Sequence, residues 1–65
     1  MPVSDLDIFR AANLVIAQHG DGARQHARDR IADLAAKGDA EGAATWSRIL
    51  LAIAALNAPP GATRN

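Results

Sequence analysis

The chain has 65 residues, a formal net charge of zero and no cysteine. A neutral chain lacks the positive charge of strongly basic nucleic-acid binders and polybasic membrane anchors, and without cysteine it has neither a disulfide nor a thiolate metal site. Hydrophobic residues make up 49% of the chain, but half of them are alanine, which contributes little buried area. We therefore expect one small domain, residues 1–65, whose thin core is completed by a partner.

The first predicted helix covers residues 5–19. Ser4 is followed three residues later by Asp7, a short version of the capping box, and Asp5 adds a second negative charge near the positive end of the helix dipole. Apolar residues then recur at helical spacing from Ile8 onward. Gly20 is placed to end the helix in a left-handed conformation.

The second predicted helix covers residues 22–37. Small and aliphatic residues from Ala23 to Leu34 follow one stripe, and charged residues occupy the other faces. Lys37 and Gly38 suit a helix end, because a cation complements the helix dipole there and glycine tolerates the terminating conformation.

The third predicted helix covers residues 40–57, capped by Asp39 and ended before Pro59. It is apolar around most of its circumference, which is typical of a helix buried on several sides. Gly42 is unfavourable inside a helix, and we attribute it to the close approach of another backbone, from the second helix or a second subunit. Residues 58–65 are predicted to be a flexible tail.

These elements predict an all-α fold, three short helices in a small bundle that dimerisation completes. Strands are not expected, because β-branched residues are few and no stretch alternates between apolar and polar residues. The short connections favour antiparallel or sharply angled neighbours. The N-terminus lacks the regions of a signal peptide, and the longest apolar run is far shorter than the about 20 residues of a membrane span, so we expect a cytoplasmic protein with no membrane partner.

The third helix also supplies the predicted interaction surface. Trp46 is either an exposed recognition anchor or, as its spacing with Ile49 and Ile53 favours, part of a core or subunit interface. The candidate interface residues are Trp46, Ile49, Leu50, Ile53 and Leu56. They predict a protein–protein interaction or structural module that binds itself as a homodimer or binds another protein.

Two histidines form a weak candidate polar site. His19 and His26 flank the turn between the first two helices, and imidazole is a common metal ligand. A metal site needs a third and usually a fourth ligand, and the turn offers only Asp21. We therefore predict that both histidines cap or pack, and we expect no metal site.

A basic cluster gives the alternative function, a dimeric regulatory nucleic-acid-binding protein. Arg24, Arg28 and Arg30 lie on the second helix, but acidic residues are interleaved with them and no stacking aromatic lies beside them in the sequence. These features argue against nucleic acid as a partner. No catalytic residue, phosphate-binding loop or cofactor motif is recognisable, so we predict that the chain is not an enzyme and binds no cofactor.

A longer pattern resembles a known family. Its residues are His19-Gly20, Ala23, His26-Ala27, Arg30, Leu34, Gly38-Asp39, Gly42, Trp46, Arg48-Ile49, Ile53 and Leu56. The pattern, spanning residues 8–57, resembles an uncharacterised family of short helical alphaproteobacterial proteins, a domain of unknown function. The chain departs from it at Gly22 and Arg24, where relatives tend to carry an acidic cap and a proline. The resemblance implies a small cytosolic bacterial helical protein with no assigned activity and supplies no site residue.

Overall fold

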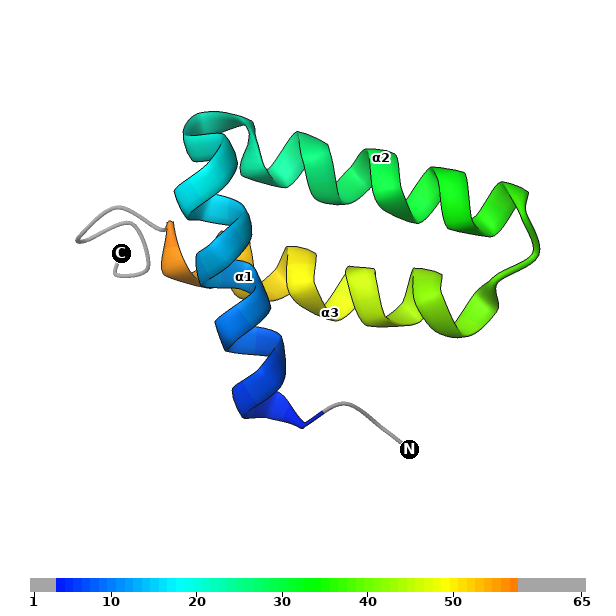
Figure 1. The fold of residues 1–65 in the computed structure, drawn as a ribbon, viewed down its shortest axis with the longest axis horizontal. Helices are drawn as coiled ribbons and strands as arrows, with labels where there is room; N and C mark the ends of the chain where they lie inside the picture. The colour runs from blue at the N-terminus through cyan, green and yellow to red at the C-terminus, as the bar shows by residue number, and fades with distance from the viewer. Residues whose placement is uncertain (1–3, 58–65) are drawn as a thin grey trace, which may run out of the picture.

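The computed structural model describes residues 4–57 of the chain, and every regular element in that part is helical (Figure 1). The elements are α1 (Asp5–His19), a 3-10 turn η1 (Gly20–Gly22), α2 (Ala23–Ala36) and α3 (Ala40–Leu56). The predicted all-α fold is confirmed. The predicted tail, residues 58–65, lies outside the described residues.

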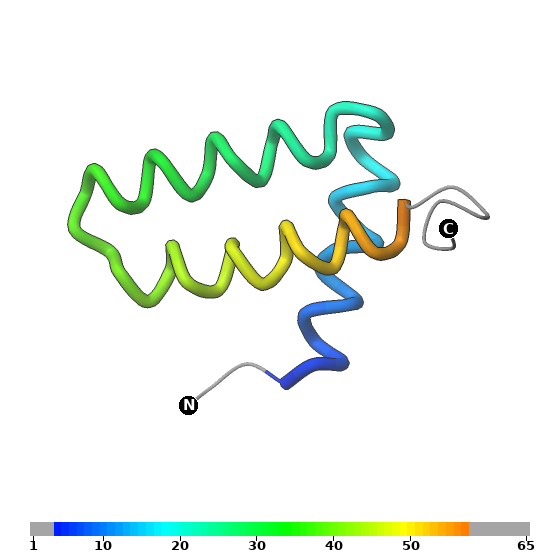
Figure 2. Tube along the Cα trace, turned by 180° about the vertical axis from the view of Figure 1, so that it is seen from behind, coloured from blue at the N-terminus to red at the C-terminus, as the bar shows by residue number. Residues whose placement is uncertain are grey.

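The prediction of three separate helices needs a correction. The helical elements follow one another without an intervening loop from Asp5 to Ala36, because the residues between α1 and α2 form the turn η1. The chain is therefore a bent helical segment, α1–η1–α2, followed by α3. Figures 1 and 2 show α2 and α3 side by side and antiparallel. α1 crosses the C-terminal part of α3 at a steep angle.

Local hydrogen bonds and glycine conformations fix where the helices begin and end. The Ser4 hydroxyl accepts from the Asp7 backbone N–H at 3.2 Å, and the Asp39 carboxylate accepts from the Gly42 N–H at 2.9 Å. Both bonds satisfy N–H groups that have no partner within the helix. Gly20 and Gly38 have φ angles of 54° and 82°, a region that other residues rarely adopt.

Gly42 has a different role from the predicted one. A Cβ atom built at this position would lie 2.5 Å from one carboxylate oxygen of Asp39 and 2.9 Å from its Cγ. The space that glycine leaves is thus occupied by the capping side chain of the same helix. The atoms nearest to the built Cβ therefore belong to Asp39 and not, as predicted, to the backbone of the second helix, and the close approach of a second subunit stays a prediction.

This contact predicts that Asp39 and Gly42 are energetically coupled. Asp39→Ala removes the cap and is expected to cost about 1 kcal/mol. Gly42→Ala raises helix propensity by about 0.5–1 kcal/mol but displaces the capping carboxylate, so we expect that gain only when Asp39 is already alanine. Urea denaturation of the two single variants and the double variant measures the coupling. An equal effect of Gly42→Ala in both backgrounds contradicts this account.

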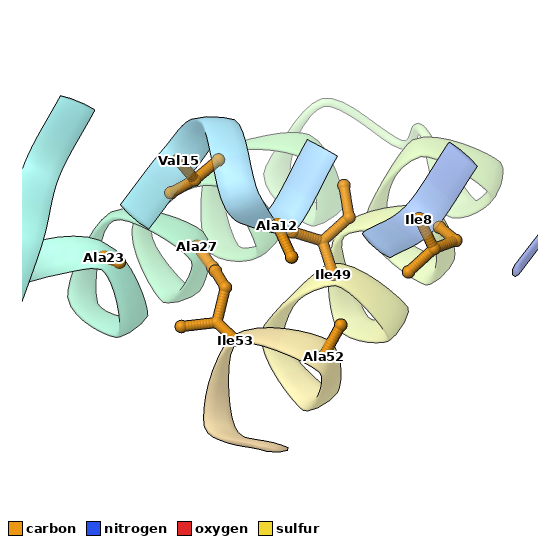
Figure 3. Close-up of a cluster of buried hydrophobic side chains, with 8 residues drawn as sticks. All are labelled: Ile8, Ala12, Val15, Ala23, Ala27, Ile49, Ala52 and Ile53. Atoms are coloured by element: carbon orange, nitrogen blue, oxygen red, sulfur yellow. The ribbon is translucent and has the colours of Figure 1, made fainter. Parts of the chain in front are cut away.

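The core lies where α1 crosses α2 and α3 (Figure 3). Among the described residues, the buried hydrophobic side chains are Ile8, Ala12, Val15, Ala23, Ala27, Ile49, Ala52 and Ile53. Half of these are alanine, and the largest side chain that is fully buried is that of Ile53. The core is therefore as thin as the composition predicts, and most of its apolar area comes from four larger side chains.

No helix in the described part of the chain combines the length and the hydrophobicity needed to cross a membrane.

Candidate functional site

The fold places most of the predicted interface residues in the hydrophobic core of the chain or against it. Ile49 and Ile53 are 5% and 0% exposed and belong to the core. Trp46 and Leu50 are half-buried and pack against that core, and only Leu56 is largely exposed, at 44%. A role for these five residues in binding a partner stays a prediction. In this fold, α1 and α2 already cover Ile49 and Ile53 and partly cover Trp46 and Leu50.

Apart from Leu56, the exposed apolar residues are different ones. Among the described residues, the large hydrophobic side chains exposed on the surface are Leu6, Phe9, Leu14, Leu51 and Leu56. Leu51 is 72% exposed, the highest value of this group. Helical geometry offered a signal for it, because Leu51 lies two residues from Ile49 and about 200° around the helix from it. Phe9 carried no comparable signal, since it lies beside the apolar stripe of α1.

Two of these side chains line one groove between α1 and α3. Its walls are formed by Asp5, Ile8, Phe9, Arg48, Leu51, Ala52 and Ala55, and its volume is about 330 Å³. We call it the α1–α3 groove. Phe9 and Leu51 are its exposed apolar walls, whereas Ile8 and Ala52 belong to the core. The groove thus connects the core to an apolar surface.

An ion pair links the two helices at this groove. Arg48 Nη2 lies 2.7 Å from Asp5 Oδ1, and 43 positions separate the two residues in the sequence. The Asp5 side chain is 90% exposed and that of Arg48 is 42% exposed, so the pair contributes little to stability, about 0–1 kcal/mol. Because the two charges face each other, they neutralise each other within an otherwise apolar groove.

His19 and His26 do come together, across the turn η1. Their rings stack with centroids 4.0 Å apart and planes inclined by 16°. The His26 ring also meets the Trp46 ring edge to face, with the two centroids 5.6 Å apart. Within residues 4–57, no group of three or more histidine or acidic side chains is arranged to hold a metal ion. The two imidazoles therefore form a packing contact that joins the start of α2 to the end of α1.

The arginines of α2 lie among acidic side chains, as the sequence indicates. Arg24 and Arg28 are exposed. Arg30 Nη1 lies 3.5 Å from Asp33 Oδ2, and its guanidinium lies 5.8 Å from the centre of the Trp46 ring. These contacts hold Arg30 against the protein, so it is less available to a phosphate backbone than a free side chain would be. Binding of nucleic acid stays a prediction that nothing in this arrangement favours.

Comparison of the chain with protein-family models, with curated proteins and with solved structures finds no match. The resemblance to the alphaproteobacterial family stays a prediction. So do the absence of enzymatic activity and the bacterial and cytoplasmic setting.

Proposed function

We propose that this chain is a small helical protein–protein interaction module that binds through the α1–α3 groove. The observation that carries the proposal is that Phe9 and Leu51, 43% and 72% exposed, border the same groove. Single exposed hydrophobic residues are common on protein surfaces and need no explanation. Apolar side chains gathered around one hollow are informative, because contiguous patches of this kind mark interaction sites.

The distribution of charge supports the same function. The second half of α3, from Ile49 onward, contains no charged residue, although part of its surface is exposed. Depletion of charge is the compositional signature of the centre of a protein interface. The charged groups that line the groove, Asp5 and Arg48, pair with each other, so the surface suits an apolar helix better than a polyanion.

The proposal takes the bacterial cytoplasm as the setting. A chain without cysteine is compatible with that reducing compartment. The family that the sequence resembles suggests the same setting.

Site-specific photocrosslinking tests the proposal. A benzoyl-phenylalanine at position 51 of the full chain, expressed in bacterial cells, is expected to form covalent adducts with a protein. The matched control places the same group at position 28, which is exposed on α2 away from the groove. Adducts at position 51 and none at position 28 support binding through the groove. No adduct at position 51, or equal yields at both positions, overturns it.

A further inference from the structure

The corner between α1 and α2 depends on the conformation of one residue. The backbone N–H of Gly20 still donates to the carbonyl of Ile16, as the next hydrogen bond of α1 would. The chain leaves the helical path at Gly20 itself, where φ is 54° and ψ is −124°. Gly22 and Ala23, which follow, have negative φ angles of −85° and −59°. Figure 1 shows α1 turning directly into α2 at this corner, with no loop between them.

The conformation of Gly20 is one that only glycine adopts readily. An L-residue with this positive φ brings its Cβ into conflict with its own backbone. A Cβ built at Gly20 would find nothing to clash with within 4 Å, so the packing around the corner does not itself require glycine. The requirement therefore comes from the backbone alone. If Gly20 took helical angles, residues 5–36 would form one straight helix about 48 Å long.

The bend is maintained by the packing of α1. Ile8, Ala12 and Val15 of α1 are buried in one core with Ile49 and Ile53 of α3. Straightening the corner carries α1 away from α3, so a single straight chain exposes both halves of its core to water. The same contacts form again if α1 of another copy takes the vacant place, because that helix has the same buried face. Exchange of an identical element is a low-cost route to a dimer, and short, strained hinges favour it.

We propose that Gly20 is a hinge at which α1 swings from the bent arrangement to one continuous with α2, and that chains in the straight form exchange α1 with a second copy. The chain's own packing specifies the contact: α1 of each copy lies where α1 of the other lay. The inference goes beyond the proposed function, because it concerns the connection of α1 and not the occupant of the α1–α3 groove.

The balance between the two forms depends on concentration. A bent monomer and an exchanged dimer have the same core contacts, so the tethering of α1 to its own chain favours the monomer. A short flexible tether corresponds to an effective concentration in the millimolar range. We therefore expect the unaltered chain to be a bent monomer at micromolar concentration and to exchange α1 only near about 1 mM.

Gly20→Ala tests the hinge. A left-handed φ is about 10-fold less favourable for an L-residue, and a dimer straightens two hinges, so we expect a dissociation constant about 100-fold lower than that of the unaltered chain. Sedimentation equilibrium of the full chain is expected to find the Gly20→Ala dimer at tens of micromolar. A Gly20→Ala chain that stays a folded monomer up to about 1 mM overturns the inference.

Two control variants change the same turn without favouring the straight form. Gly22→Ala adds a methyl group where φ is negative and where nothing lies within 4 Å of the built Cβ. Gly20→D-Ala, made by chemical synthesis, has mirror-image φ and ψ preferences, and the mirror image of the Gly20 conformation is ordinary extended backbone. Both variants are expected to stay monomers at concentrations where Gly20→Ala dimerises. Equal dimerisation of the D-alanine chain and Gly20→Ala contradicts the hinge.

A distance across the corner shows which form is present. The chain contains no cysteine, so Arg10→Cys and Ala32→Cys together carry one pair of spin labels at exposed positions of α1 and α2. In a straight helix these positions lie about 33 Å apart, and the bent path makes the separation shorter. Pulsed electron spin resonance of labelled chains diluted with unlabelled chains measures this distance within one chain. We expect the longer distance in the Gly20→Ala dimer and the shorter one in the unaltered monomer.

The remaining outcomes also decide the inference. A Gly20→Ala dimer with the shorter distance pairs without opening the corner, which overturns the exchange of α1. A Gly20→Ala chain that loses its helical circular dichroism overturns it too, because the inference requires that the straight form is folded. Photocrosslinking at position 51 does not depend on these results, so the proposed function is tested separately.

Discussion

Replacing Ile53 by alanine is expected to lower the free energy of unfolding by about 2–5 kcal/mol. Ile53 is 0% exposed and is the largest side chain that is fully buried among the described residues. Its truncation leaves a cavity that neighbours cannot fill, because half of the surrounding core is alanine. A single core in a chain this short rarely supplies more than about 3–5 kcal/mol, so most Ile53→Ala molecules should be unfolded at 25 °C. Far-ultraviolet circular dichroism against urea measures the loss.

Two control variants separate the cavity from other effects. Ile53→Val removes one methylene group and is expected to cost about 0.5–1.5 kcal/mol. Leu51→Ala shortens a side chain that is 72% exposed on the same helix, so in dilute solution it should change stability by less than about 0.5 kcal/mol. Equal losses for Ile53→Ala and Leu51→Ala would mean that the face of α3 assigned to the core is not the buried one.

Enlarging Ala27 to leucine is expected to destabilise the chain by at least about 1–3 kcal/mol. Ala27 is 0% exposed on α2, in the same core as Ile53 (Figure 3). Leucine at this position would have to displace neighbouring side chains or force α2 away from α3. For a domain of this size each kcal/mol corresponds to about 4–8 °C in Tm, so thermal unfolding is a sensitive measurement.

Ala32→Leu is the matched control for Ala27→Leu. Ala32 lies on the same helix but is exposed, and alanine and leucine have similar helix propensities, so little change in Tm is expected. If Ala27→Leu leaves Tm unchanged as well, the close packing of α2 against α3 at Ala27 is incorrect.

The sequence by itself determined where most helix ends lie to within about one residue, but it did not determine that the 3-10 turn η1 joins α1 to α2. Ser4 and Asp39 each accept a hydrogen bond from a backbone N–H three residues later, and Gly20 and Gly38 adopt positive φ angles where they were expected to end helices. These features depend on atoms only a few residues apart, so composition and spacing are sufficient to predict them. The same local rule placed His19 and His26 on either side of one turn, where their rings stack.

Only the tertiary structure decided which face of α3 is buried and which is exposed. Because α3 is apolar around most of its circumference, its hydrophobic pattern places Leu51 opposite Ile49 but does not show which of the two faces packs against α1 and α2. The 3-10 turn η1 sets the angle at which α1 returns across α3, and that crossing buries Ile49 and Ile53 while it leaves Leu51 on the surface. The groove between Phe9 and Leu51 joins residues from two helices far apart in the sequence. Burial is a property of all neighbours in space, and these neighbours exist only once the helices have packed.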